Sequence, residues 1–370
     1  MSTVFVSCGE PSGDAHAAAL VTALRGLAPD VAVEGVGGPK LAAAGAQLMA
    51  RIEELTVIGF VEVAKKIPAH LRLLRAIERR LARGDVKLIV LVDYPGFHLR
   101  VAAAAHRLGV PVFYYIAPQL WAWREGRVRQ MARTVSRLAV ILPFEEEFFR
   151  QRGVPATFVG HPLMDRPPLE GDRGTLKAAL GLDPGRPLLG LFPGSRTQET
   201  ARLWPIFRDA ARQVLRSRPD VQSLVAATGG GDYPDAAGVR IVPGRAAECF
   251  AAADAALCKS GTTTLEAALA LTPQVVAYRL NALSYRLARR LVKVPWIGLV
   301  NLVAGRQIAP EFVQADARPD RLAQAVLPLL DPASPERRSQ LEGLAEVRRR
   351  LGGPGAAGRA AALARELLVA

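Results

Sequence analysis

Residues 3–27 read TVFVSCGEPSGDAHAAALVTALRGL, a stretch whose pattern changes from strand to helix within a few positions. The first six residues are of β-strand type, a turn with Gly9 and Gly13 follows, and a helical pattern begins directly after it. The same succession recurs, with strand-like runs at 31–36, 87–92, 112–116 and 138–142 and helical patterns at 39–50 and 98–108. This alternation predicts a parallel sheet with crossover helices.

A second series with the same order begins at 187–192. Strand-like runs continue it at 223–227, 239–242, 254–258 and 274–278, and a helical pattern near 203–217 follows the turn PGSR at 193–196. Between the two series, residues 165–174 are polar, contain Pro and Gly and lack periodicity, which is typical of an inter-domain linker. We therefore expect an α/β protein of two Rossmann-like domains that face each other across a cleft.

The predicted boundaries are 1–164 for the N-terminal domain, 175–353 for the C-terminal domain and 354–370 for a C-terminal helix. A chain of 370 residues is long enough to bury two hydrophobic cores. The helical tail is interrupted at GGP (352–354), and nothing in it indicates catalysis.

The composition restricts the compartment and the kind of site. The three cysteines, Cys8, Cys249 and Cys258, lie far apart and outside any Cys/His cluster, so neither a disulfide framework nor a zinc site is indicated. No apolar run reaches the ~18 residues of a membrane-spanning helix, and the N-terminus lacks the pattern of a secretion signal. We expect a cytoplasmic protein.

The formal net charge is +14, which favours contact with nucleic acid, anionic lipid or phosphorylated substrates. A solvated basic surface explains the same charge equally well. Nucleic acid is not an expected partner, because no helix-turn-helix, zinc or RNP pattern is present.

Candidate site residues in the first domain follow two strands. In an open parallel sheet, ligands bind beyond the carboxyl ends of the strands. Glu10 and Ser12 lie in the turn after the first strand, and His16 lies in the helix that follows. Asp93 ends the strand 87–92, where its carboxylate can act as a base or cap the next helix.

In the second domain, two turns resemble anion sites at helix N-termini. The first contains Gly194, Ser195 and Arg196, and an arginine can bind a diphosphate with two parallel hydrogen bonds. The second contains Ser260, Gly261 and Thr262 and is followed one helical turn later by Glu266, whose carboxylate can bind ribose hydroxyls or stabilise the first turn. Two such turns in one domain favour a nucleotide site.

The chain lacks the motifs of several other chemistries. It contains no G-x-x-x-x-G-K-[ST], no H-E-x-x-H and no D-x-D of the kind that metal-dependent sugar transferases use. We predict no metal site and no cofactor. A departing diphosphate would then be neutralised by helix dipoles and basic side chains.

Residues 57–83 are the segment most suited to a membrane surface. Val57, Ile58, Phe60, Val61 and Val63 are unusually apolar, and a helical pattern follows in which leucines and Ile77 alternate with five arginines. The pattern suits docking onto anionic headgroups, and an ordinary helix with a basic outer face remains an equal alternative. A second basic amphipathic stretch, 285–294, is a further candidate.

Ten segments, in this order along nearly the whole chain, resemble the signature segments of the lipid-A-disaccharide synthase family. They are GEPSGD (9–14), GVGGP (35–39), GFVEV (59–63), DYPGF (93–97), WAWR (121–124), LPFE (142–145), GHP (160–162), PGSR (193–196), SGTTTLE (260–266) and NLVAGR (301–306). The resemblance implies a GT-B fold. It also implies transfer of 2,3-diacylglucosamine from UDP to the 6-hydroxyl of 2,3-diacylglucosamine 1-phosphate, forming a β-1,6 bond with inversion.

The resemblance also assigns roles. Asp93 is the expected general base, with His16 as the alternative, and Glu10 and Ser12 line the acceptor side. The nucleotide residues named above hold the UDP-sugar donor, with Asn301 in the donor region. The chain departs from some members at His98, where they have Asn, and at Lys259, where they have a small residue.

The resemblance further places the enzyme at the inner face of the cytoplasmic membrane, against an anionic surface, with a homodimer left open. Another GT-B enzyme with a UDP-N-acetylglucosamine donor, either a peptidoglycan transferase or a 2-epimerase, remains an alternative function. A non-catalytic nucleotide-sugar binding protein is the third.

Overall fold

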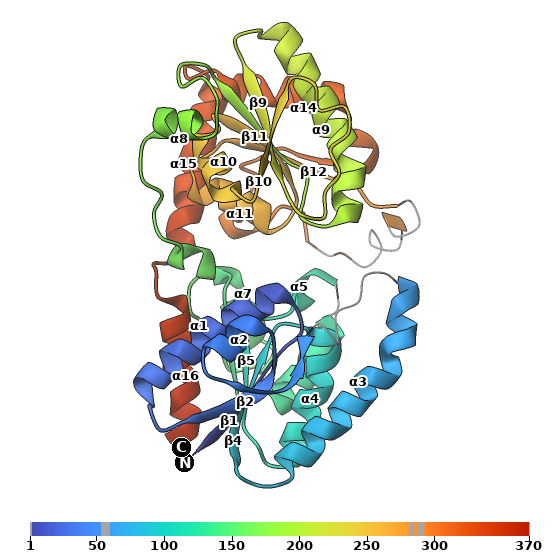
Figure 1. Ribbon diagram of the computed structural model, residues 1–370, viewed down its shortest axis with the longest axis vertical. Coiled ribbons are helices and arrows are strands. Elements are labelled where there is room, and N and C mark those ends of the chain that lie inside the picture. The colour runs from blue at the N-terminus through green and yellow to red at the C-terminus, as the bar shows by residue number, and fades with distance from the viewer. Residues whose placement is uncertain are drawn as a thin grey trace. The chain divides into compact units, whose positions relative to one another are not determined.

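The computed structural model describes residues 2–52, 60–123, 125–281, 285–286, 292 and 294–369, without the side chains of 60–67. The chain forms two compact units, Met1–Asp165 with Leu351–Ala370, and Arg166–Arg350. Each unit contains a parallel sheet covered by helices (Figure 1).

The first unit contains a sheet of seven parallel strands in the order β3-β2-β1-β4-β5-β6-β7. From one edge to the other these are Gln47–Arg51, Ala32–Gly37, Thr3–Cys8, Val86–Val92, Val112–Tyr115, Arg137–Val140 and Ala156–Phe158. Its helices are α1 (Pro11–Leu27), α2 (Pro39–Ala43), α3 (Phe60–Leu81), α4 (Pro95–Arg107), α5 (Leu120–Trp123), α6 (Val128–Thr134), α7 (Pro143–Arg150) and α16 (Ala356–Val369).

The second unit contains a sheet of six parallel strands in the order β10-β9-β8-β11-β12-β13. These strands are Val239–Pro243, Gln222–Ala227, Leu188–Phe192, Ala255–Lys259, Gln274–Tyr278 and Glu311–Val313. Its helices are α8 (Arg173–Ala179), α9 (Thr197–Ser217), α10 (Ala246–Ala252), α11 (Thr262–Leu269), α13 (Leu299–Ala304), α14 (Pro319–Val326) and α15 (Pro335–Arg350).

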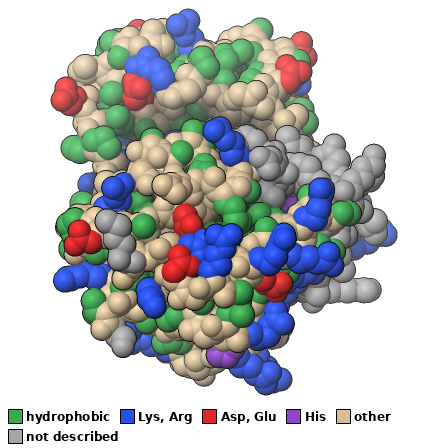
Figure 2. Space-filling view, turned by 60° about the horizontal axis from the view of Figure 1, so that its bottom comes forward, with side chains coloured by type: hydrophobic (Ala, Val, Ile, Leu, Met, Phe, Trp, Pro, Cys, Tyr) green, Lys and Arg blue, Asp and Glu red, His purple; other side chains and the backbone are tan. Residues whose placement is uncertain are grey.

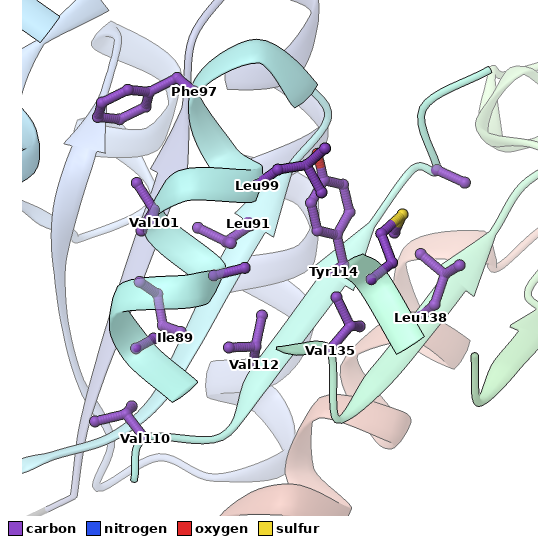
Figure 3. Packing of buried hydrophobic residues seen from close by; sticks show 14 of the residues in the cluster. Ile89, Leu91, Phe97, Leu99, Val101, Val110, Val112, Tyr114, Val135 and Leu138 are labelled. Atoms are coloured by element: carbon purple, nitrogen blue, oxygen red, sulfur yellow. The ribbon is translucent and has the colours of Figure 1, made fainter. Parts of the chain in front are cut away.

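Alternating strand residues build two cores in the first unit, one on each face of the sheet. Ile89 and Leu91 of β4 and Tyr114 of β5 belong to the core that α3, α4 and α6 cover, part of which is shown in Figure 3. Leu88 and Val90 point the other way, into the core that α1 and α16 cover. Because successive strand side chains leave opposite faces, continuous apolar runs mark strands that are buried on both sides.

The predicted helix over 39–50 is wrong. Helix α2 ends at Ala43, the backbone turns at Gly45 with φ +92°, and β3 follows as an edge strand. The edge strands β7 and β13 were also not predicted, because three-residue strands carry too little periodicity. The last helix, α16, packs against α1 and thus belongs to the first unit.

Candidate active site

The strand order reverses between β1 and β4 in the first unit and between β8 and β11 in the second. In open α/β sheets a ligand binds beyond the carboxyl ends of the strands at such a reversal. Glu10 and Asp93 lie in the loops after β1 and β4, and the turns 193–196 and 260–261 follow β8 and β11. Within each unit, the predicted site residues other than Asn301, which lies on α13, therefore follow the strands at one reversal point.

The loop after β1 leads directly into α1. Glu10 occupies the N-cap position without a side-chain cap hydrogen bond, and both Glu10 and Ser12 are exposed. His16 is half-buried one turn further on, with its ring edge-on to Tyr115 at a centroid distance of 6.5 Å. These three polar residues thus share the first turns of α1.

Asp14, in the same segment, has a structural role. It is buried, and its carboxylate accepts hydrogen bonds from the main-chain N–H groups of Gly38 (2.7 Å), Lys40 (3.0 Å) and Leu41 (3.1 Å). These are orphan donors at the start of α2, so Asp14 caps a helix other than its own.

The loop after β4 has an unusual backbone. Asp93 and Tyr94 both adopt positive φ, +50° and +51°, before α4 begins at Pro95. A non-glycine residue in this left-handed region costs on the order of 1–3 kcal/mol and persists only where its surroundings enforce it. Tyr94, not Asp93, occupies the N-cap position of α4.

Hydrogen bonds hold the Asp93 backbone on both sides of its Cα. Its N–H donates to the Tyr115 carbonyl at 3.1 Å, while its own carbonyl accepts from the Tyr114 hydroxyl at 2.6 Å and from His98 Nδ1 at 2.7 Å. His98 Nε2 lies 2.9 Å from the Ser7 hydroxyl. Burial lowers the pKa of His98 to about 4, so its ring is neutral at physiological pH.

The Tyr94 side chain connects this loop to its neighbours. A Cβ on Gly9 would lie 2.3 Å from Tyr94 Cγ, so the ring packs on a position that only glycine fits. Its hydroxyl lies 2.8 Å from His70 Nε2 on α3. Burial first, and the nearby Glu10 carboxylate second, raise the pKa of Tyr94.

In the second unit, Gly194 gives the turn after β8 a φ of +122°. Ser195 and Arg196 are exposed there, and Arg196 occupies the N-cap position of α9 without a side-chain cap hydrogen bond. The Glu199 carboxylate accepts from the Ser195 N–H at 3.3 Å and pairs with Lys259 Nζ at 3.0 Å. Because Lys259 ends β11, this pair joins the two glycine turns.

The turn after β11 exposes a second helix N-terminus. Gly261, with φ +124°, is the N-cap of α11 and supplies no side chain, and Thr262 is exposed. The Ser260 hydroxyl donates to the Ile297 carbonyl at 2.6 Å, and its N–H donates to the Ala277 carbonyl at 3.1 Å. Glu266, one helical turn along, forms a 2.6 Å ion pair with Arg166.

Asn301 lies in a buried network. Its Nδ2 donates to the Ala309 carbonyl (2.8 Å) and to Glu311 (2.7 Å), and its Oδ1 accepts from the N–H groups of Ile308 (2.8 Å) and Ala309 (2.9 Å). Glu311 also accepts from the main-chain N–H groups of residues 297 and 298. Asn301 therefore holds together the segment that Ser260 contacts.

The paired tryptophans have different environments. Trp121 is buried and donates its indole N–H to the buried Glu145 at 2.9 Å, whereas Trp123 is 44% exposed. Burial is the main cause that raises the pKa of Glu145 to about 7. One ring is thus core with a polar handle, and Arg124 lies outside the described residues.

Helix α3 is partly core and partly surface. Leu73, Ile77 and Leu81 are buried in the first core, and Arg80 pairs with Glu34 at 2.6 Å. Leu71, one of the leucines of the predicted apolar stripe, is exposed, as are Arg72, Arg75 and Arg79, and Arg83 is exposed just after the helix ends. Lys and Arg side chains gather on this side of the unit (Figure 2), and a hollow of 590 Å³ is lined by Arg72, Arg75, Glu78 and Arg79.

The rest of the predicted membrane segments lies outside the described residues. This holds for Val57 and Ile58, for the side chains of Phe60, Val61 and Val63, and for most of 285–294. None of the helices that the structure describes is both long and apolar enough to cross a bilayer. In the same described ranges, no three His, Cys, Asp or Glu side chains are grouped as metal ligands.

Two parallel Rossmann-like sheets, each with polar residues in the loops at its reversal point, are the architecture of a GT-B glycosyltransferase. The glycotransferase of kitacinnamycin aligns with a TM-score of 0.64 and 19% identity over 99% of this chain and 98% of that one. MurG of Acinetobacter baumannii aligns with a TM-score of 0.60 and 16% identity over 99% and 100%. Likeness at these identities establishes the fold.

The chain belongs to the lipid-A-disaccharide synthase family, since the family model described as lipid-A-disaccharide synthetase matches residues 4–352. The synthase of Anaeromyxobacter dehalogenans (strain 2CP-C) is 45% identical over 362 residues, which cover 95% of this chain and 94% of that protein. That of Myxococcus xanthus (strain DK1622) is 42% identical over 373 residues, covering 99% and 97%.

The chain is therefore a glycosyltransferase of lipid A biosynthesis, with a UDP-diacylglucosamine donor and diacylglucosamine 1-phosphate as acceptor. The predicted α/β class, GT-B fold, family and activity are confirmed. Family membership decides against the peptidoglycan transferase, the 2-epimerase and the non-catalytic binding protein.

Sequence reasoning missed the residues that contact the predicted site residues from outside the site. Tyr114 lay inside the predicted strand 112–116, Arg166 lay in the predicted linker, and nothing in the sequence singled out Glu199. His98 stood out only as a departure from some relatives, although a histidine between the apolar Phe97 and Leu99 was the one available signal of a buried polar contact.

Proposed function

We propose that Asp93 is the general base of this transferase and that the two glycine turns of the second unit hold the donor diphosphate. Asp93 accepts the proton of the acceptor 6-hydroxyl as that oxygen bonds to the anomeric carbon. The bond from this carbon to the UDP oxygen breaks, and UDP leaves with the electron pair, inverting the configuration. The observation that carries the proposal is the left-handed loop that holds Asp93 at the reversal point of its sheet.

The donor side rests on main-chain donors and cations. The N-termini of α9 and α11 carry no side-chain caps, and each helix dipole contributes roughly 0.3–1 kcal/mol toward an anion. Arg196 and Lys259 add positive charge beside Gly194, Ser195, Gly261 and Thr262. Together they stabilise the charge that develops on the departing diphosphate.

The nucleoside is assigned to Glu266, whose carboxylate accepts hydrogen bonds from the ribose hydroxyls once Arg166 moves aside. Ser260 and Asn301 contribute by shaping the backbone of the donor region.

The acceptor is assigned to the first unit. Glu10 and Ser12, exposed at the start of α1, line its sugar side. His16 is the second candidate for the base, because it is half-buried in the first turns of the same helix.

A membrane surface is the proposed partner of α3. Its exposed arginines suit anionic headgroups, each contributing about 1 kcal/mol near an anionic surface. The diacylated substrates reside in such a surface, which supports a cytoplasmic enzyme bound to the inner face of the cytoplasmic membrane. A homodimer stays a prediction, and no nucleic-acid partner is proposed.

Mass analysis of a reaction with both diacylated substrates tests the function and the base together. Wild type and His16→Gln are expected to form the disaccharide and UDP, and Asp93→Asn is expected to form neither at a comparable rate. An active Asp93→Asn combined with an inactive His16→Gln would transfer the base role to His16. Absence of disaccharide with the wild type would refute the proposed reaction.

A further inference from the structure

Within the described part of the chain, the carbonyl oxygen of Asp93 accepts hydrogen bonds from two donors, both on buried side chains. Tyr114 on β5 and His98 on α4 are fully buried, and neither of these bonds belongs to a helix or a sheet ladder. A carbonyl oxygen has two lone pairs, so the two donors saturate it. Two separate elements of the first unit thus converge on one atom of the left-handed loop.

The proton positions of this network follow from its chemistry. A carbonyl only accepts, so His98 Nδ1 carries the proton of the neutral ring. Nε2 is then the unprotonated nitrogen and accepts from the Ser7 hydroxyl on β1. A chain of hydrogen bonds thus runs from Ser7 on β1 through His98 on α4 to Asp93 in the loop after β4.

When this carbonyl is held in place, the position of the Asp93 Cα, from which the side chain extends, is held as well. The Asp93 N–H is held by the Tyr115 carbonyl at 3.1 Å, so hydrogen bonds fix the main chain on both sides of the Cα. With φ held at +50°, the direction of the Cα–Cβ bond is set. A relaxed backbone would redirect the carboxylate, and misplacement of a catalytic group by about 1 Å can cost on the order of 100-fold in rate.

We propose that His98 and Tyr114 are positioning residues that hold the Asp93 backbone in its left-handed conformation and thereby aim the carboxylate. This inference rests on the proposed role of Asp93 as the base. It assigns a role to two residues that never touch either substrate, and it gives a reason for a buried histidine in this helix.

Steady-state kinetics on three variants tests the proposal. Tyr114→Phe removes only the hydroxyl and keeps the ring, and His98→Leu removes both ring nitrogens. His98→Asn keeps a donor at the δ position, where the histidine has Nδ1. With the geometry effect cited above as the scale, we expect kcat to fall about tenfold in Tyr114→Phe and about 100-fold in His98→Leu, and to stay within about threefold in His98→Asn.

A merely structural role would give a different pattern. We therefore measure the KM for the donor, the stoichiometry of UDP binding and Tm beside kcat. Positioning predicts that kcat falls while the donor KM and the UDP stoichiometry stay at wild-type values. Thr272→Val is the matched control, because its buried hydroxyl donates to the Phe250 carbonyl at 2.7 Å in the second unit. It should lower Tm and leave kcat unchanged.

The possible outcomes distinguish the positioning role of His98 and Tyr114 from the base role of Asp93. Wild-type kcat in Tyr114→Phe and His98→Leu, with Asp93→Asn inactive, would overturn the positioning role and leave the base assignment intact. Failure of His98→Asn to restore kcat would also overturn it. An active Asp93→Asn would remove both. If His98→Leu does not fold, Tyr114→Phe decides the matter alone.

Discussion

The loop after β4 and the glycine turns of the second unit both contain residues with positive φ, but they use different kinds of residue to reach it. In the first unit, Asp93 and Tyr94 adopt positive φ without being glycines, and buried side chains hold Asp93 there. In the second, Gly194 and Gly261 adopt φ of +122° and +124°, where a glycine pays no steric penalty.

The difference follows from the roles that we propose for the two loops. A base must be a side chain, so glycine is excluded and the surrounding structure has to enforce the conformation. A diphosphate is held by main-chain N–H groups, so glycine brings the backbone close to the ligand. In the second unit a half-buried ion pair, Glu199 with Lys259, connects the two glycine turns.

The largest effect is expected from Asp93→Asn, which keeps the size of the side chain and removes the base. We expect kcat to fall by about 10³, within the usual range for general base catalysis, while the Kd for UDP is unchanged. Steady-state kinetics measures kcat, and titration calorimetry measures the Kd for UDP. A parallel loss of UDP affinity would contradict the division of labour between the units.

We expect the membrane-binding surface, like the base, to lie on the first unit. Replacing Arg72, Arg75 and Arg79 by Gln removes three exposed charges, at about 1 kcal/mol each, so partition onto anionic vesicles should fall by up to about 100-fold. Sedimentation with vesicles measures it.

The control carries the same charge change on the second unit. Arg216, Arg348 and Arg349 are exposed there, and their replacement by Gln should leave partition nearly unchanged. Equal losses in both triple variants would show that net charge, and not α3, governs binding.

Gly261→Ala tests whether UDP binding depends on the main-chain conformation of the glycine turn after β11. At φ +124° an alanine is strained, so the turn should shift and the Kd for UDP should rise about tenfold. Gly244→Ala is the matched control, because Gly244 also has positive φ, +71°, and lies in another loop of the same unit. An equal rise of the Kd for UDP in both variants would show that a general loss of stability, and not the turn at Gly261, weakens binding.

The smallest effect is expected from Lys259→Gln. Loss of one cation beside the diphosphate should weaken UDP binding about fivefold and reduce its dependence on salt. Glu199→Gln leaves the lysine in place and removes its carboxylate partner, so it should tighten binding or leave it unchanged. Weaker UDP binding in both variants would show that the Glu199–Lys259 ion pair only stabilises the two turns and that Lys259 does not contact the diphosphate.

The central strands were predictable because β1, β4, β8 and β11 are buried on both faces and therefore read as continuous apolar runs. The candidate site followed, since its residues come directly after those runs. The edge strands β3, β7 and β13 were not predicted, whereas the edge strand β10 was predicted as 239–242. The segment 39–50 was predicted as a helix, although β3 occupies its second half.

The sequence by itself determined the family, the order of the central strands along the chain, and the positions at which a base and a diphosphate site could lie, because each depends on residues close together in the chain. Only the tertiary structure decided which groups hold Asp93, because Ser7, His98 and Tyr114 come from separate elements that meet through folding. It likewise decided that α16 completes the first unit. Such partners leave no local pattern, since nothing in a strand or helix shows which distant atom its side chain will meet.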